Sequence, residues 1–396
     1  MSSSAVVVSF QPTKWLARCL DSVVGQADEV ILVDNGSENA AIDAYRCPGV
    51  KVVRLAENKG FASGVNAGLA VSRGEVVALL NDDAVASPGW IEASRRVLAA
   101  SDVAAVAPKI VLARRFGEVL LDDEVHFAPG DGRPLGRRVT SATFGGQDVL
   151  GSLLGPGLHR LEQGVDGQRW RWTAGRRAVY VPLPETLETS ADLSVGTELV
   201  LNGEPLPVRR LVDLVNSAGA YLRRDGYAGD CGADLPDDDR WAEKRECFAV
   251  TGTALVTTSA VLERVGPLEA GYFAYYEDTD WCWRARLQGY RIMYDPVATV
   301  RHVRGLTSGG TLASRTRFLA ERNRILTLAR CAPLPLALGE ARRKFSGGGD
   351  DGVAGVLPRA LVSALAQRTR LRRRWALKSR EVYDRWAGVD VPEEYE

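Results

Sequence analysis

Short apolar runs alternate with segments of helical spacing through the first hundred residues, and this alternation constrains the fold more than any other feature. The β-branched run Ala5–Phe10 predicts a buried strand, and apolar residues from Trp15 to Gly25 recur at helical spacing. The pattern continues with expected strands at Glu29–Val33, Val50–Leu55 and Glu75–Leu80 and an expected helix at Phe61–Ser72. Parallel strands need such crossovers, so the sequence predicts an α/β fold with helices on both faces of a sheet.

Polar and acidic residues follow three of these strands directly. They are Ser9-Phe10-Gln11, Asp34-Asn35-Gly36-Ser37 and Asn81-Asp82-Asp83. In open α/β sheets, ligands bind beyond the carboxyl ends of the strands. The sequence therefore predicts a polar binding site along one edge of the sheet.

The chain divides by pattern into four regions. After a first half at 1–110, residues 111–214 are rich in Gly, Pro and Arg and hold the turn Asn202-Gly203, which predicts a β-rich insertion. Regular structure returns over 215–313, and residues 314–396 have a helical pattern that is basic between Arg342 and Lys378. The third region has expected strands at Cys247–Thr257, Arg291–Tyr294 and Ala298–Val300, expected helices at Ser259–Val265 and Gly271–Arg286, and an expected loop at Asp225–Asp239.

Composition disfavours several classes of protein. The 396 residues hold 50 Lys and Arg and 50 Asp and Glu, so no net field steers the chain toward nucleic acid. The six cysteines, Cys47 among them, show no Cys-x-x-Cys spacing, which disfavours a zinc site or a disulfide framework. No stretch reaches the ~20 apolar residues that span a bilayer, and the start of the chain lacks a basic signal segment. We expect a cytoplasmic protein.

The acid pair Asp82-Asp83 follows a fully apolar strand. Two carboxylates there must face solvent or a cation, because burying them unpaired costs too much free energy. Such oxygen ligands suit Mn²⁺ or Mg²⁺, ions that commonly bridge a protein carboxylate and a substrate diphosphate. His302, just after an expected strand, is a separate candidate, because imidazole is a common ligand of Mn²⁺-class metals. The alternative is a plain turn or helix cap at the acid pair and a structural histidine.

Three carboxylates, those of Glu277, Asp278 and Asp280, lie within four positions between aromatic residues. If they face one way, their repulsion raises the pKa of at least one of them, as a general base near neutral pH requires. The alternative is an acidic first helical turn that the helix dipole favours. The aromatic neighbours argue against a simple solvated surface.

Taken in order, the motifs resemble family 2 glycosyltransferases with the GT-A fold, and most closely a rhamnosyltransferase-like branch. The matching residues of the first half are Asp34-Asn-Gly-Ser, the stretch Glu57–Gly68 and Leu80-Asn81-Asp82-Asp83. Those of the second half are Gly252, Gly266, Tyr272-Phe273, Tyr276-Glu277-Asp278-x-Asp280, Arg284, Gly289-Tyr290, Pro296 and His302. The resemblance covers about residues 5–110 and 215–330 and implies a Rossmann-like, nucleotide-binding mixed sheet.

For the donor, the resemblance implies a nucleoside-diphosphate sugar. Asp34 would contact the pyrimidine base in a pocket lined by Ser9 and Phe10. The implied contacts to the ribose or the diphosphate are Asn58, Gly60, Asn66, Asn81 and Asp82.

For the metal, the resemblance implies Asp83 and His302 as ligands of Mn²⁺ or Mg²⁺, with Asp82 beside them on the ribose or a metal-bound water. Asn81 stands where many relatives have the first Asp of an Asp-x-Asp motif. This departure leaves the number of protein ligands open.

For the chemistry, the resemblance implies Asp278 as the catalytic base and Glu277 as its neighbour, with Asp280 and Trp281 toward the acceptor. The base would deprotonate an acceptor hydroxyl that attacks the anomeric carbon opposite the leaving diphosphate. One carboxylate suffices for a single displacement, so the configuration would invert, whereas hydrolases use two carboxylates.

Several alternatives stay open. The sugar could be rhamnose on dTDP, or galactofuranose or another hexose on UDP. The acceptor could be a cell-surface glycan, a lipid-linked saccharide or a small natural product. A nucleotidyltransferase would need a Gly-rich loop after the first strand, where Gln11-Pro12-Thr13-Lys14 has no glycine. A non-catalytic carbohydrate-binding relative is the other alternative.

Two further surfaces are candidates for binding. Trp170 and Trp172 alternate on a strand, share one face and could bind acceptor glycan, although packing in the insertion's own core is as reasonable. The basic C-terminal helices could contact the inner face of an anionic membrane, with a solvated helical face as the alternative.

Overall fold

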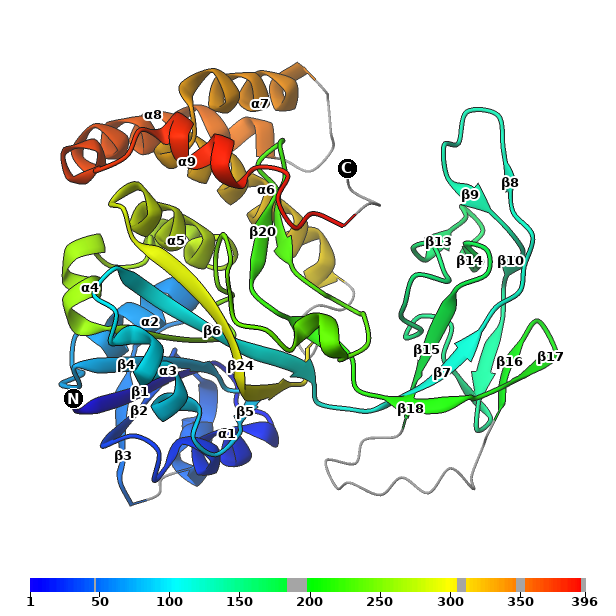
Figure 1. Ribbon diagram of the computed structural model, residues 1–396, viewed down its shortest axis with the longest axis horizontal. Coiled ribbons are helices and arrows are strands. Elements are labelled where there is room, and N and C mark those ends of the chain that lie inside the picture. Colours follow the sequence, from blue (N-terminus) through cyan, green and yellow to red (C-terminus); the bar gives the residue numbers. More distant parts are fainter. Residues whose placement is uncertain (46–47, 184–197, 305–310, 347–352, 393–396) are drawn as a thin grey trace. The chain divides into compact units, whose positions relative to one another are not determined.

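The computed structural model describes residues 1–45, 48–183, 198–304, 311–346 and 353–392 (Figure 1). Within these residues the chain forms two compact units. The first unit holds residues 1–110, 217–231 and 239–396, and the second holds 111–216 and 232–238. Cys47 lies outside the described residues, and the five described cysteines are free.

The first unit is built on one large mixed sheet, whose main path runs β22-β24-β6-β23-β4-β1-β2-β3. Its parallel strands are β1 (Ser3–Ser9), β2 (Glu29–Asp34), β3 (Val50–Arg54) and β4 (Val76–Asn81). The other strands on the path are β6 (Val103–Leu112), β22 (Arg245–Glu246), β23 (Ala254–Thr258) and β24 (Arg291–His302), and β5 (Ala84–Ala86) pairs with β24. Every residue of β1 is buried, as a continuous apolar run in a sheet covered on both faces requires.

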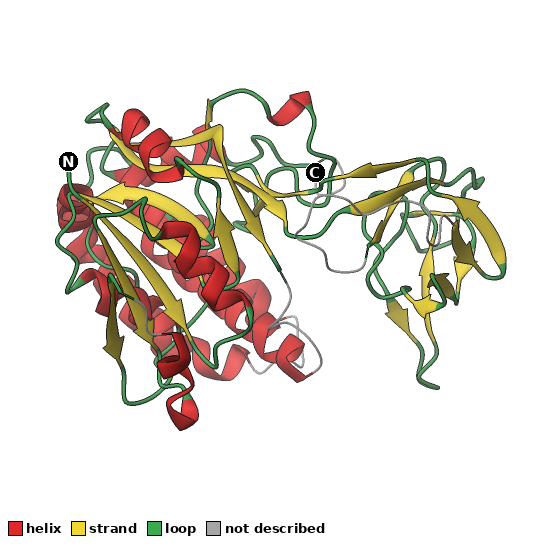
Figure 2. Ribbon diagram, turned by 90° about the horizontal axis from the view of Figure 1, so that it is seen from below, coloured by secondary structure: helices red, strands yellow, loops and turns green. Residues whose placement is uncertain are grey.

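Helices cover this sheet (Figure 2). They include α1 (Trp15–Val23), α2 (Phe61–Leu69), α3 (Trp90–Leu98) and α4 (Ser259–Val265). On α2, a Cβ at Gly64 would lie 2.5 Å from Cγ1 of Val8, and one at Gly68 would lie 2.4 Å from Cγ1 of Val6. These glycines therefore let α2 pack directly against β1.

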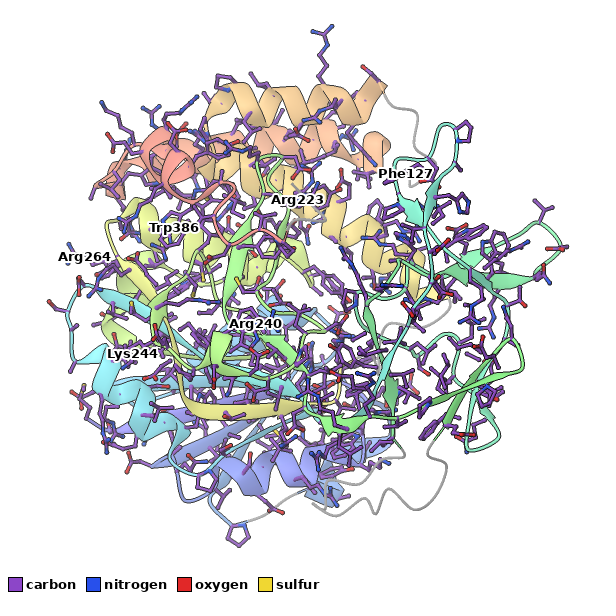
Figure 3. All side chains as sticks on the ribbon, turned by 45° about the vertical axis from the view of Figure 1, so that its right-hand side comes forward. Phe127, Arg223, Arg240, Lys244, Arg264 and Trp386 are labelled. Carbon is purple, nitrogen blue, oxygen red and sulfur yellow. The ribbon has the colours of Figure 1, made fainter. Side chains whose placement is uncertain are left out.

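The C-terminal region is helical. Its helices are α5 (Glu277–Leu287), α6 (Thr311–Cys331), α7 (Leu334–Ser346), α8 (Val353–Leu371) and α9 (Ser379–Trp386). Trp386 of α9, labelled in Figure 3, packs against the rest of the unit. Its ring centroid lies 3.9 Å from the Arg286 guanidinium and 6.4 Å from the centroid of the Phe248 ring. Among the described residues, no helix combines the length and the apolar character that crossing a membrane requires.

Five expected elements differ from the structure. Arg291–Tyr294 and Ala298–Val300 belong to one strand, β24. This strand pairs with β22 before Pro296 and with β5 after it. The strand expected from Cys247 begins only at Ala254. The other two differences are β21 (Ala228–Asp230), which pairs with β20 (Ala220–Leu222) inside the expected loop, and α5, which begins at Glu277 and not at Gly271.

The second unit is built from strands in its described residues. Its hairpin β16–β17 turns at Asn202-Gly203, both with positive φ (50° and 88°), which is the geometry that the Asn-Gly pair favours. A separate apolar core includes Val119, Val179 and Leu199. The strands are β7 (Phe116–Leu120), β8 (His126–Phe127), β9 (Pro134–Leu135), β10 (Arg138–Val139), β11 (Ala142–Phe144), β12 (Gln147–Asp148), β13 (Glu162–Gln163), β14 (Arg169–Trp172), β15 (Ala178–Pro182), β16 (Glu198–Leu201), β17 (Glu204–Pro207), β18 (Arg210–Val212) and β19 (Val215–Ser217).

Candidate active site

The carboxyl ends of β1 and β4 bring Ser9 and Asp82 together in the first unit. The Ser9 hydroxyl donates a hydrogen bond of 2.6 Å to Oδ2 of Asp82. Burial raises the pKa of Asp82 to about 6, against the Ser9 hydrogen bond, which lowers it, and the neighbouring Asp83 charge raises it further. A second carboxylate this close to a desolvated one is the setting in which a bound cation is strongly favoured.

Asp83 and His302, far apart in the sequence, also meet at this edge. Nε2 of His302 lies 3.1 Å from Oδ1 of Asp83, and both side chains are largely buried. The backbone causes this approach, because β24 pairs with β5 so that His302 lies opposite Ala84, and Val303 N–H donates to the Asp83 carbonyl. A carboxylate oxygen and an imidazole nitrogen that face each other form two of the ligands that Mn²⁺ accepts.

The donor set at this point fits a divalent cation shared with a ligand. Among the described residues, no group of three or more His, Cys, Asp or Glu side chains is arranged to hold a metal ion. Asp83 and His302 would therefore supply two ligands, and a diphosphate and water would complete the shell, as is usual for Mg²⁺ in nucleotide sites.

Glu277 and Asp278 open α5 and differ in their surroundings. The Asp278 carboxylate accepts hydrogen bonds from the Gly252 N–H (2.7 Å), the Thr279 N–H (2.6 Å) and the Thr279 hydroxyl (3.2 Å), and it is partly exposed. Glu277 is buried, and its Oε2 has no hydrogen-bond partner among the described residues.

These surroundings separate the protonation states of the two carboxyls. Burial raises the pKa of both groups, and the charge of Asp278 raises that of Glu277 further, to well above its usual value. The hydrogen bonds that Asp278 accepts act against burial and lower its pKa. Burial and the neighbouring charge therefore favour the neutral form of Glu277, whereas the three donors around Asp278 favour its charged form.

Asn35, directly after β2, holds the loop that follows β3. Nδ2 of Asn35 donates to the Gly60 carbonyl (3.1 Å) and to Oδ1 of Asn58 (3.2 Å), and the Gly60 N–H also donates to that oxygen (2.9 Å). Asp34 accepts from the Ser37 N–H at 2.9 Å and lies 3.6 Å from Nη1 of Arg54, while the Phe10 side chain is 46% exposed. The Oδ1 of Asn58 is thus engaged inside the protein.

Three residues expected at the donor or the acceptor make contacts inside the protein. Both amide atoms of Asn66 bond the backbone of Leu268 (2.9 and 3.0 Å), so both of its polar side-chain atoms are used there. Asp280 is fully buried between Arg284 and Arg330, and Trp281 is 3% exposed with its Nε1 donating to the Gly266 carbonyl. Neither side chain has the exposed surface that contact with an acceptor needs.

The two tryptophans of the insertion lie on β14 in the second unit. Trp170 donates from Nε1 to Oε2 of Glu162 (3.0 Å), and the Arg138 guanidinium lies 4.2 Å from its ring centroid. Trp172 is half-buried on the same strand. Because a guanidinium already covers one face of Trp170, only its other face is left for a sugar ring.

A further carboxylate, Asp230 on β21, lies near the candidate base. Burial raises its pKa to about 6, with the charge of Asp278 raising it and those of Arg304 and His302 lowering it. From the sequence, this residue was expected in the loop Asp225–Asp239. Its proximity depends on the pairing of β20 with β21, for which a strand of only three residues gives little signal.

Comparisons with known proteins place part of this chain beside a family. Residues 4–119 match the family model "Glycosyl transferase family 2". An uncharacterized glycosyltransferase from Nostoc sp. is 30% identical over 114 residues, which are 27% of this chain and 35% of that protein. The chain thus spans about a third of the length of this relative.

Two solved structures match most of this chain. GalNAc-T7, crystallised with UDP, GalNAc and Mn²⁺, shares 12% identity over 93% of this chain and 56% of its own, with a TM-score of 0.51. The mannosyltransferase PcManGT from Pyrobaculum calidifontis, in complex with GDP-Man and Mn²⁺, shares 13% identity over 97% of this chain and 87% of its own, with a TM-score of 0.41. The family match and the fold together support a glycosyltransferase family 2 domain of GT-A fold in this chain.

Proposed function

We propose that this chain is a metal-dependent, inverting glycosyltransferase that uses a nucleoside-diphosphate sugar. The observation that carries the proposal is the meeting of Asp83 and His302 at 3.1 Å, beside the Ser9–Asp82 contact, at the carboxyl edge of the sheet. A structural salt bridge alone would not need the second, largely desolvated carboxylate of Asp82 next to it.

Each residue has a stated part in the proposed reaction. Asp83 and His302 would hold the cation, and Ser9, Asp34 and Asp82 would line the nucleotide side. The metal, when bound, would neutralise charge on the diphosphate oxygens. Asp278 would take the proton of the acceptor hydroxyl while the new bond from that oxygen to the anomeric carbon forms and the bond to the diphosphate breaks. A single displacement of this kind inverts the anomeric configuration.

The different surroundings of Glu277 and Asp278 support the assignment of Asp278 as the base. Two adjacent carboxylates cannot both stay ionised at low cost in a buried position. Glu277 has burial and an unpartnered oxygen, whereas Asp278 has three donors and partial exposure.

The donor and acceptor are also proposed. Rhamnose on dTDP is the first candidate, galactofuranose or another hexose on UDP is the second, and the acceptor hydroxyl belongs to a cell-surface glycan, a lipid-linked saccharide or a small natural product.

The test is transfer from a panel of dTDP- and UDP-sugars in the presence of Mn²⁺, with the product anomer read by NMR. We expect one donor to react and to give the anomer opposite to its own. Retention of configuration would contradict the single displacement, and no transfer from any donor would favour a non-catalytic relative.

Contact with an anionic membrane through the C-terminal region is part of the proposal. Arg372, Arg373 and Arg374 follow α8 directly and are exposed. Each basic side chain near an anionic surface contributes about 1 kcal/mol. Replacing the three with serine is expected to reduce sedimentation with phosphatidylserine vesicles, and unchanged sedimentation would contradict the contact.

A further inference from the structure

The backbone before the candidate base has an unusual conformation. Phe273, Tyr275 and Tyr276 have φ values of 67°, 71° and 68°, and none of them is glycine. A side chain at positive φ is strained, and a bulky aromatic one especially so. Three such residues within four positions persist only where surrounding contacts hold them.

The turn formed by residues 272–276 fixes where α5 begins. Tyr276 occupies the left-handed region (φ 68°, ψ −3°) at the N-cap, and Glu277 and Asp278 are the next two residues. On its other side the turn lies against the loop after β3, because a Cβ at Gly60 would lie only 2.3 Å from the Phe273 carbonyl oxygen. The conformation of this turn therefore determines the position of the base relative to the loop after β3.

One buried side chain from another part of the chain holds the turn. Asn323 on α6 is fully buried, and its Nδ2 lies 3.0, 2.9 and 2.8 Å from the carbonyl oxygens of Tyr272, Ala274 and Tyr275. Only the amide NH₂ can face three carbonyls, because the side-chain oxygen would be repelled. Both of its protons are therefore used on the turn, and Oδ1 has no partner among the described residues.

We infer that Asn323 is a positioning residue that holds the strained turn and thereby aims Asp278 at the acceptor hydroxyl. It does not touch substrate, and it lies on α6, outside the residues that match the family model. The inference deepens the proposed function and rests on it for the part that concerns transfer. Part of the ordering of the turn therefore comes from the C-terminal helical region.

The test compares Asn323→Ala with a matched variant of the same helix, Thr327→Val. Thr327 is also buried, and its hydroxyl bonds the Tyr272 hydroxyl at 3.0 Å, so its loss removes a contact to the flank of the turn and not to the turn's backbone. In Asn323→Ala we expect hydrogen exchange at residues 274–278 to become at least about 10-fold faster, with residues 281–287 unchanged. In Thr327→Val we expect no such local change.

Transfer is measured in parallel, below the unfolding temperature of each variant. Asn323→Ala is expected to lower kcat about 100-fold, the cost of misplacing a catalytic group by about 1 Å, with the KM for the donor nearly unchanged. Thr327→Val is expected to keep kcat within about 3-fold. If Asn323 had only a structural role, both variants would lose stability, and kcat would not differ between them in this way.

A rescue variant separates positioning from loss of packing. Tyr275 is 37% exposed, and Tyr275→Gly removes the strain of its positive φ. In the Asn323→Ala background this second change is expected to recover about 10-fold of the lost kcat. No recovery, with the exchange of residues 274–278 unchanged in Asn323→Ala, overturns the inference.

Failure of the inference and failure of the proposed function give different results. If the wild-type chain transfers no sugar, the proposed function fails, and the exchange comparison alone decides whether Asn323 orders the turn. If the wild-type chain transfers sugar and Asn323→Ala does so equally well, the positioning role fails and the proposed function stands.

Discussion

Replacing Asp278 with Asn is expected to lower kcat by about 10²–10⁴-fold, the usual contribution of a positioned general base. The amide keeps the shape of the side chain, and its single oxygen can still accept either from the Gly252 N–H or from the Thr279 N–H and hydroxyl, so part of this hydrogen bonding is retained. It cannot take a proton from the acceptor. Because Asp278 does not contribute to the nucleotide side of the site, binding of the nucleoside diphosphate should be unchanged, which separates chemistry from folding.

The activity of the wild-type enzyme should also depend on pH on the acidic side. Burial raises the pKa of Asp278 above its ordinary value of 3.8, and a base works only when ionised. Activity of the wild-type enzyme should therefore be lost as the pH falls through that raised pKa. The residual activity of Asp278→Asn should lack this acidic limb.

Glu277→Gln is the matched control for Asp278→Asn. Because burial and the neighbouring charge raise the pKa of Glu277 well above its usual value, glutamine resembles the neutral form that these surroundings favour. We expect a loss of kcat at least about 10-fold smaller than that of Asp278→Asn. A larger loss in Glu277→Gln would mean that the two carboxyls have exchanged roles.

Replacing Asp280 with Asn is expected to lower the free energy of unfolding by about 3–5 kcal/mol, as when one member of a buried ion pair is removed. Asp280 is fully buried, with Nε of Arg284 at 2.7 Å and Nε of Arg330 at 2.6 Å. Burial alone would raise its pKa, but the two guanidiniums outweigh that and lower it. The variant would leave both cations buried with too little negative charge nearby.

The measurement for Asp280→Asn is denaturant unfolding, with Asp384→Asn as its control. Asp384 pairs with Arg380 at 2.7 Å on an exposed face of α9, so its loss should cost less than about 1 kcal/mol. Equal losses in the two variants would contradict the view that the Asp280 network is a structural centre of the domain.

Local pattern was sufficient for the strands that build the site. The apolar runs before Ser9, Asp34 and Asn81 predicted both the strands and the edge where the polar residues gather, because burial on both faces leaves a continuous signal. The contact of Asp83 with His302 was expected only through the family resemblance. Its physical cause is the pairing of β24 with β5, which no local pattern encodes.

The errors occur where distant contacts override local preference. The helix at Glu277 was expected to begin at Gly271, because nothing local signals three aromatic residues at positive φ, which Asn323 and Gly60 impose from other elements. Asn66 belonged to a motif expected at the donor, yet its amide bonds the backbone of Leu268. In the same way, the burial of Asp280 depends on two arginines, of which only Arg284 is near in sequence.

Above all, we propose that Asp83 and His302 hold a divalent cation that also binds the diphosphate of the nucleotide. The most direct test is the thermal unfolding of the wild-type chain, Asp83→Ala and His302→Ala against UDP, dTDP and GDP, with and without Mn²⁺. A ligand that binds only the folded state raises its stability by about 2.7 kcal/mol at a hundred times its Kd. We predict a Mn²⁺-dependent rise with UDP or dTDP in the wild-type chain and its loss in both variants. No rise with any nucleotide, or an equal rise in Asp83→Ala, would contradict the claim.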